Sequence, residues 1–340
     1  MADPASTGRL DRPPSPDRIA TLPSSLRRRY LLCVDTEEEF DWADRRRWHL
    51  SGVSAAAAIP AAHRRFRAAG AAVTYLADYP IVADDAAVGA LGETIAAGGA
   101  TIGAQLHPWV NPPLPPDTAD SSFAGALPPE LEEAKLAALA ARIATAFGVR
   151  PLAYRAGRYG VGPRSAAALV RQGFALDLSV RPLFDYAAEG GPDFTDFGGQ
   201  PFWAGEGRRL LAVPLGSALT GHWRRLGGGW YRRFGRVPPA LAVLARLKLL
   251  ARVALTPEGM PIADALEAAR ALLGEGVPLL SLSFHSPSLV PGNTPYVRDA
   301  AALADFWRWW DAIFAFLARE GVEPVSTDAL AAFVRGGEAD

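Results

Sequence analysis

Short apolar runs alternate along this chain with longer segments whose apolar residues recur at helical spacing. The runs are rich in β-formers, as buried strands of a parallel sheet are. We predict strands at residues 30–34, 72–77, 101–106, 152–155, 174–180, 210–214, 277–284 and 322–326. Predicted helices lie between them, at residues 55–70, 84–97, 130–147, 163–172, 262–274 and 300–319. This alternation predicts an α/β fold, and about seven or eight parallel strands favour a distorted (β/α) barrel over an open sheet.

The length allows one large barrel or two domains, since the chain has 340 residues. A hydrophobic fraction of 49% permits a sizeable core. Residues 1–28 are rich in Pro, Ser, Asp and Arg and lack the apolar stretch of a signal peptide, so we predict a disordered or loosely attached tail there. We expect a single barrel domain at residues 29–335, with loop insertions near 181–206 and 217–252.

Charge and cysteine content exclude several classes of protein. The net charge is −1, so no overall field points to a nucleic-acid partner. The single cysteine, Cys33, excludes an internal disulfide and a cysteine-based zinc site. No apolar run approaches the roughly 18 residues of a transmembrane segment. We therefore expect a cytoplasmic protein.

An acidic run, residues 35–41, follows the first predicted strand directly. In α/β proteins the carboxyl ends of parallel strands are where active sites lie. Asp35 and Glu37 can supply a general base beside a metal ligand. The alternative interpretation is an acidic, solvated loop after a core strand.

Other predicted strands also end in residues able to do chemistry, namely His107, Arg155 followed by Arg158, Asp177, and His285. Taken singly, each histidine is more often a satisfied structural group than a ligand. Barrel enzymes, however, draw catalytic residues from several strand ends on one rim. The set as a whole therefore predicts an active site.

Five segments in this order and spacing resemble the polysaccharide deacetylase (NodB-homology, carbohydrate esterase 4-like) superfamily, and most of all its WalW-like branch. The matching segments are residues 34–42, 105–113, 154–160, 177–180 and 283–289. The resemblance extends from residue 30 to about residue 330. It implies a distorted (β/α) barrel and a divalent-metal hydrolase of bacterial type that removes N-acetyl groups from a carbohydrate.

The resemblance also implies a metal site. Glu37 matches the carboxylate ligand of the family and His107 matches a histidine ligand. Family members carry a second histidine four residues later, where this chain has Asn111. The amide oxygens of Asn111 and Gln105 are poorer zinc ligands than imidazole. We therefore expect a divalent ion held by Glu37, His107 and Asn111, either zinc or a harder ion such as manganese, cobalt or magnesium.

Four catalytic roles follow from the same resemblance. Asp35 matches the catalytic base, and Arg155 would orient it. His285 would be the general acid, with Asp177 orienting it and keeping it protonated. Arg155 could instead form a structural ion pair at the rim, and Asp177 could cap a helix or turn.

Aromatic and basic residues near the predicted rim suggest contacts to substrate. We expect Trp42, Trp109, Arg158 and Tyr159 to bind it, because aromatic faces suit sugar rings. Loop tryptophans also serve simply to staple loops over a core. The basic, aromatic segment 223–236 could associate weakly with an acidic glycan, a lipid-linked sugar or a membrane surface, or be a solvated insertion.

The absence of a second histidine in the expected metal site leaves two alternatives to a carbohydrate deacetylase. One is a catalytically impaired barrel that binds carbohydrate without cutting it. The other is an amidohydrolase that acts on a small non-sugar amide.

Overall fold

Helices and strands alternate through the residues that the computed structural model describes, which are 8–41, 52–115, 122–235, 237 and 239–336. The strands are β1 Arg29–Thr36, β2 Val73–Ala77, β3 Ala100–Leu106, β4 Ala153–Ala156, β5 Leu176–Asp177, β6 Phe202–Ala204, β7 Leu210–Ala212, β8 Ser217–Thr220, β9 Ala251–Ala254, β10 Leu279–His285 and β11 Glu323–Pro324. The helices are α1 Ile59–Ala68, α2 Tyr79–Ala83, α3 Asp85–Ala96, α4 Pro129–Phe147, α5 Ser165–Arg171, α6 Gly227–Gly235, α7 Ala240–Arg246, α8 Ile262–Gly274, α9 Ala300–Arg319 and α10 Thr327–Val334.

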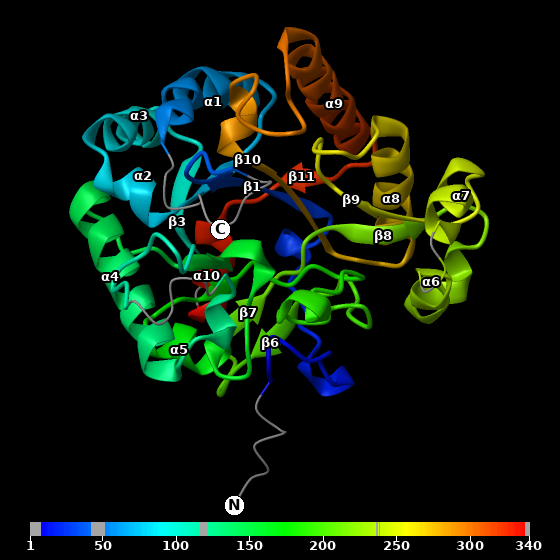
Figure 1. Ribbon diagram of the computed structural model, residues 1–340, viewed down its shortest axis with the longest axis horizontal. Coiled ribbons are helices and arrows are strands. Elements are labelled where there is room, and N and C mark those ends of the chain that lie inside the picture. Colours follow the sequence, from blue (N-terminus) through cyan, green and yellow to red (C-terminus); the bar gives the residue numbers. More distant parts are fainter. Residues whose placement is uncertain (1–7, 42–51, 116–121, 236, 238, 337–340) are drawn as a thin grey trace, which may run out of the picture.

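The centre of the molecule is a curled, mostly parallel sheet with helices around its outside (Figure 1). Its strand order is β10-β1-β2-β3-β4-β5-β7-β6, and β11 pairs with the start of β1. Only the β6–β7 pair of this sheet is antiparallel among the described residues. The strands β8 and β9 form a separate antiparallel ribbon. This arrangement confirms the predicted α/β, barrel-like fold.

The side chains of β1 alternate between the inside of the curled sheet and the helical layer. Leu31 and Cys33 belong to the inner cluster, whereas Leu32 and Val34 pack in the cluster that includes the outer helices. Because successive side chains of a strand point to opposite faces, Asp35 continues the inner row at the carboxyl end. The strand pattern therefore directs this carboxylate into the mouth of the barrel.

The same alternation applies to β10. Leu280, Leu282 and Phe284 pack toward the helices, and Leu279 lies inside. His285 therefore faces the inside at the end of the strand, beside Asp35.

A segment between β7 and β8 connects the two sides of the curled sheet. The N–H groups of Val213 and Leu215 donate to the carbonyls of Asp177 and Val180, both at 2.8 Å. The next N–H, of Gly216, donates to the carbonyl of Ser281 on β10 at 2.9 Å. The curled sheet is therefore joined on this side by a few main-chain hydrogen bonds rather than by a full ladder.

The prediction of a disordered tail is wrong for residues 8–28. Leu10, Leu22 and Leu26 are buried: Leu22 and Leu26 insert into the inner cluster, whereas Leu10 packs in the cluster that includes the outer helices. Ile19 forms an antiparallel bridge with Phe202 of β6, the last strand of the sheet. Residues 1–7 lie outside the described part of the chain.

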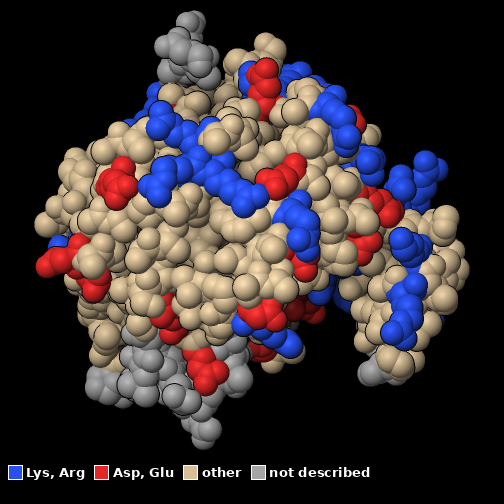
Figure 2. Space-filling model, turned by 90° about the horizontal axis from the view of Figure 1, so that it is seen from above, with Lys and Arg blue, Asp and Glu red and all other residues tan. Residues whose placement is uncertain are grey.

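The insertion between β8 and β9 carries α6 and α7, which lie at the side of the molecule (Figure 1). Neither helix contains a buried residue. Basic side chains line this part of the surface (Figure 2). Trp223 and Trp230 of the same insertion are exposed. Among the described residues, no helix is both long and apolar enough to cross a membrane.

Candidate active site

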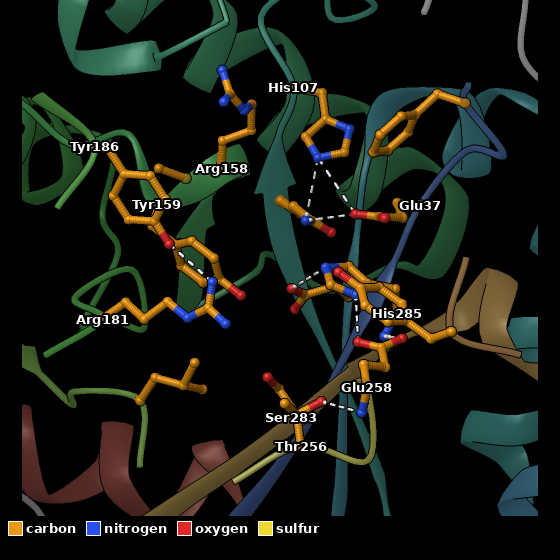
Figure 3. A pocket seen from close by; sticks show the side chains of 16 residues that line it. Glu37, His107, Arg158, Tyr159, Arg181, Tyr186, Thr256, Glu258, Ser283 and His285 are labelled. Carbon is orange, nitrogen blue, oxygen red and sulfur yellow. Dashed lines mark hydrogen bonds and ion pairs between the residues drawn. The ribbon is translucent and has the colours of Figure 1, made fainter. Parts of the chain in front are cut away.

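A cavity of about 170 Å³ opens at the carboxyl ends of the strands. This is an order of magnitude more than one water molecule requires, so it can hold a small ligand or one end of a larger one. Its lining includes the strand-end residues Asp35, Glu37, Gln105, His107 and His285 (Figure 3). The structure thus brings together side chains that lie far apart in the sequence.

Arg155, at the end of β4, is completely buried and ion-paired with Asp35. One guanidinium nitrogen donates to Asp35 Oδ1, and Nε donates to the carbonyl of Leu178 at 2.9 Å. The other oxygen of Asp35, Oδ2, lies 3.7 Å from Nε2 of His285. Arg155 therefore fixes the orientation of Asp35, and this orientation keeps Oδ2 near the imidazole.

Glu258, which follows β9, is the carboxylate that holds His285. Its Oε2 lies 2.6 Å from Nδ1 of the imidazole, and its Oε1 accepts the main-chain N–H of His285 at 3.1 Å. Burial lowers the pKa of His285, but the negative charges of Glu258 and Glu37, together with the hydrogen bond to Glu258, raise it to about 10. These charges therefore favour the protonated imidazole.

Asp177 does not contact His285, although the sequence resemblance suggested that it would orient this imidazole. Leu176 and Leu178 both belong to the inner cluster, so Asp177 between them points the other way. It accepts hydrogen bonds from Ser179, at 2.7 Å from Oγ and 3.1 Å from the main-chain nitrogen. Burial raises the pKa of Asp177 to about 6, against these hydrogen bonds. Asp177 thus stabilises a turn, as the alternative interpretation proposed.

Glu258 is not among the residues predicted from the sequence, because it follows a strand, β9, that was not predicted either. It lies in a turn between Pro257 and Gly259. The only signal in the sequence is that residues 250–263 contain no other acid.

His107 is held so that one ring nitrogen faces the cavity. Its Nδ1 lies 2.7 Å from Oε2 of Glu38, and its ring stacks on Trp109 with centroids 4.4 Å apart. Trp109 in turn donates to Oε1 of Glu38 at 2.8 Å. With Nδ1–H donated to Glu38, the lone pair of Nε2 is available on the cavity side, where Glu37 Oε2 lies 3.5 Å away.

The cavity side of His107 fits a divalent ion. Two ligand atoms bound to one tetrahedral metal at about 2.0–2.1 Å lie about 3.4 Å apart, close to the observed separation of Glu37 Oε2 and His107 Nε2. Glu37 Oε1 and Gln105 Oε1 are buried and have no hydrogen-bond partner among the described residues. Burial raises the pKa of Glu37 to about 8, although His285 and His107 oppose the shift, and a bound cation would favour its charged form. Glu37, His107 and Gln105 could therefore hold the ion.

A second group that could hold a metal ion consists of Glu38, Asp78 and His107, whose ligand atoms lie within 4.8 Å of one another. Glu38 and Asp78 are completely buried and do not line the cavity. Asp78 caps α2 by accepting from the N–H of Ile81 at 3.0 Å and accepts from that of Glu38 at 2.9 Å. Burial raises the pKa values of both carboxyls. Glu38 is thus placed to orient His107 through its hydrogen bond to Nδ1, and Asp78 supports Glu38 by accepting its main-chain N–H.

Asn111 does not line the cavity, contrary to its expected role as a ligand. Its Nδ2 donates to the carbonyl of Lys135 on α4 at 3.0 Å. The ammonium of Lys135 donates to the carbonyls of Pro108, Asn111 and Pro113. These contacts turn the Asn111 side chain toward α4. Gln105 faces the cavity instead, because it lies two residues before His107.

Of the four residues expected to bind substrate, two line the cavity. Trp42 lies outside the described residues. Trp109 is buried beneath the site and does not line the cavity, so it acts as a support for His107. Arg158 and Tyr159 do line it.

The backbone between β4 and α5 is shaped to fit this site. Arg158 and Tyr159 have φ angles of 52° and 61°, in the left-handed region that costs non-glycine residues of the order of 1 kcal/mol or more each. Gly157 approaches His107 so closely that a Cβ atom there would lie 2.1 Å from Cδ2 of the ring. The absence of a side chain at Gly157 therefore allows His107 its position.

Comparison with known proteins adds a likeness in fold. No family model matches the chain, and neither does any curated protein. A solved structure from Mycobacterium smegmatis, assigned as a polysaccharide deacetylase, matches with a TM-score of 0.52 and 18% identity over 95% of each chain. Puue allantoinase matches with a TM-score of 0.46 and 16% identity over 88% of each chain, too weakly to carry an argument. At these identities, the first match shows a shared fold and no more.

Proposed function

We propose that this protein is a metal-dependent hydrolase that removes N-acetyl groups from a carbohydrate. One observation carries the proposal: Asp35 and His285 face each other beside Glu37 and His107 in a single cavity. A base, an acid and a pair of metal ligands are what hydrolysis of an acetamide requires. The order of the matching sequence segments supports a relationship to the WalW-like polysaccharide deacetylases.

The metal position that we favour is on the cavity side of His107, with Glu37 and Gln105 as the other protein ligands. Turning the Gln105 amide about its Cγ–Cδ bond would exchange Nε2 for the unpartnered Oε1. Glu38 would hold the imidazole from the other side. A bound metal would lower the pKa of its water and polarise the acetamide carbonyl.

Asp35 is the residue that we assign as general base. Its Oδ1 is held by Arg155, which leaves Oδ2 to accept a proton from the attacking water. Because Arg155 is completely buried and also bonded to a main-chain carbonyl, it holds the carboxylate in one orientation. Arg155 thus acts as a positioning residue.

His285 is the residue that we assign as general acid. Cleavage of the C–N bond leaves electrons on nitrogen, and the departing amine needs a proton. Glu258 keeps the imidazole charged, and Nε2 remains directed toward Asp35. The same charge would stabilise the negative oxygen of the tetrahedral intermediate.

One observation favours a barrel that binds carbohydrate without cutting it. Nε2 of Gln105 lies 3.0 Å from Glu37 Oε2 and 3.3 Å from His107 Nε2, so an amide donor satisfies both ligand atoms without a metal. A small non-sugar amide is the other alternative substrate.

Metal analysis of the purified protein before and after chelation separates the first two functions. We expect a bound divalent ion, and acetate release that is lost with chelator and restored by adding the ion back. Failure to bind any of zinc, manganese, cobalt or magnesium would reject the metal-dependent enzyme. Acetate release screened over N-acetyl sugars and small acetamides then separates the two substrate classes.

A further inference from the structure

The cavity has a second wall whose chemistry differs from that of the strand ends. Arg158, Tyr159, Arg181 and Tyr186 line it, and Figure 3 shows them across the cavity from His107, Glu37 and His285. None of these four residues has a role in the proposed reaction. Its position suits it to contact the part of a ligand that does not react.

Arg181 is the arginine of this wall that forms no ion pair with an acidic residue of the described chain. Its guanidinium lies 3.9 Å from the ring centroid of Phe184 and 4.8 Å from that of Tyr159. One nitrogen donates to the hydroxyl of Tyr186 at 2.9 Å. Its Nε is buried and has no hydrogen-bond partner in the described part of the chain.

Two other arginines near the cavity have acidic partners. Arg155 is paired with Asp35, and Arg158 is paired with Glu189. None of the ion pairs among the described residues includes Arg181. The nearby acid Glu258 is already bonded to His285. Within the described part of the chain, the positioning residue Arg155 therefore has a counter-ion and Arg181 has none.

A second guanidinium strengthens the positive field at this wall. Arg252 of β9 lies 3.7 Å from the same Phe184 ring and donates to the carbonyl of Leu183 at 2.9 Å. It forms no ion pair with a described residue either. Two like charges that share one aromatic ring repel each other, and an anion nearby would relieve that repulsion.

The chemistry of this wall selects the kind of ligand group that it can bind. A partly buried guanidinium costs free energy unless an anion meets it. Its planar set of donors matches the two oxygens of a carboxylate or a phosphate. We propose that Arg181 binds an anionic substituent of the substrate, a carboxylate or a phosphate, while the acetamide lies at Asp35 and His285. The orientation of the acetamide rests on the proposed function, whereas binding of the anion does not.

Calorimetric binding tests this directly, without turnover. The probes are N-acetylglucosamine, N-acetylmuramic acid, and the 1- and 6-phosphates of N-acetylglucosamine. We expect at least one anionic sugar to bind about 10- to 100-fold more tightly than the neutral sugar. The muramic acid and the phosphates distinguish a carboxylate from a phosphate as the preferred group.

Substitution of Arg181 then assigns the preference to this residue. Arg181→Gln should remove the preference while leaving the affinity for N-acetylglucosamine unchanged. Arg181→Lys keeps the charge but loses the paired donors, so it should retain part of the preference, and it serves if the glutamine variant does not fold. The matched control is Arg164→Gln, which removes a positive charge from the exposed surface.

The outcomes separate this proposal from the proposed function. Equal affinity of the wild-type protein for neutral and anionic sugars would overturn the role of Arg181, as would an anionic preference that survives in Arg181→Gln. If anionic sugars bind through Arg181 but no acetate is released from any probe, the binding proposal stands and the deacetylase function fails. If acetate is released with the same kcat/KM from neutral and anionic sugars, the function stands and the role of Arg181 fails.

Discussion

Asp35 and His285 are partners in the register of two adjacent parallel strands, and their Oδ2 and Nε2 atoms lie 3.7 Å apart. The separation is set by the β1–β10 ladder, which pairs Arg29 with Leu279 and continues to this pair. A ladder in the core is more rigid than a loop, and proton transfer needs groups held within hydrogen-bond reach. The sheet itself therefore spaces the proposed base and acid.

The roles of Asp35 and Glu37 can be separated by substitution. Asp35→Asn keeps the shape of the side chain but removes the basic oxygen, so turnover should fall about 10²–10⁴-fold. Metal content should be unchanged, because Asp35 is bonded to Arg155. Glu37→Gln should lower metal content as well as turnover. Acetate release and elemental analysis measure the two effects. Near wild-type turnover in Asp35→Asn would remove Asp35 from the mechanism.

The pH dependence of activity should depend on Glu258. The charge of Glu258 helps raise the pKa of His285 to about 10, whereas burial lowers it. Glu258→Gln removes the charge and leaves the burial, so the pKa of His285 must fall. Since a general acid must be protonated, the alkaline limb of kcat/KM should move to lower pH. The pH–rate profile and NMR titration of the imidazole both measure the shift.

Ser288→Ala is the matched control for this experiment. Its hydroxyl donates to Glu258 Oε1 at 2.5 Å, so the variant removes a hydrogen bond to the same carboxylate without removing charge. The alkaline limb should stay close to its wild-type position. If Glu258→Gln leaves the limb and the imidazole titration unmoved, Glu258 does not set the proton affinity of His285.

Gly157→Ala should disturb the site by displacing the His107 side chain, which packs against Gly157. The added Cβ would lie 2.1 Å from Cδ2 and 2.9 Å from Nε2 of His107. Either the backbone at residue 157 or the His107 ring must therefore move. We expect weaker metal binding, lower turnover and a loss of stability of about 1–3 kcal/mol. Gly89→Ala on α3 is the control, since nothing lies within 4 Å of its Cβ position, and it should be neutral or gain up to about 1 kcal/mol. Unchanged metal affinity and thermal stability in Gly157→Ala would contradict the close fit.

The stability of the protein should depend on pH through Glu132 of α4. Burial raises its pKa to about 7, against the hydrogen bond from Ser165 Oγ, whereas in the unfolded chain it titrates near its ordinary value of 4.5. Between these values the folded state binds a proton that the unfolded state releases. This contribution to stability is complete below about pH 4.5 and is lost as pH rises through 7.

Glu132→Gln should remove that dependence. Its free energy of unfolding should match that of the wild type at low pH and exceed it above pH 7, by an amount on the order of 2 kcal/mol. Denaturant unfolding at a series of pH values measures this. Parallel curves for the wild-type protein and the variant would show that the pKa of Glu132 is the same in the folded and unfolded states.

The sequence located Asp35, His107, Arg155 and His285 because each follows or ends a short apolar run. In a parallel sheet, the carboxyl ends of all strands meet at one edge, so position along the chain predicts position in space. The register partnership of β1 and β10 could not be read in this way, because it depends on which strands become neighbours. Strand ends were therefore predictable, whereas the distances between them were not.

Glu258 and Asp177 show why the rest was missed. Glu258 reaches His285 from a turn, where no periodic pattern marks the direction of a side chain. Asp177 ends a strand, β5, that is only two residues long. In a strand, a shift by one residue moves a side chain to the opposite face, so the expected inward direction of Asp177 was wrong. The inward direction of Gln105 follows from the same period of two, counted back from His107.

The N-terminal segment has a consequence for association between copies of the chain. The antiparallel strand β6 ends the order of the sheet, and the bridge from Ile19 to Phe202 and the hydrogen bond from Ala20 N–H to the carbonyl of Pro201 cover part of it. An uncovered edge strand offers free N–H and C=O groups to any other strand. Removal of residues 8–28 would bare both that edge and the apolar pockets of Leu10, Leu22 and Leu26. The shortened chain should therefore self-associate into aggregates under conditions in which the full chain stays dispersed.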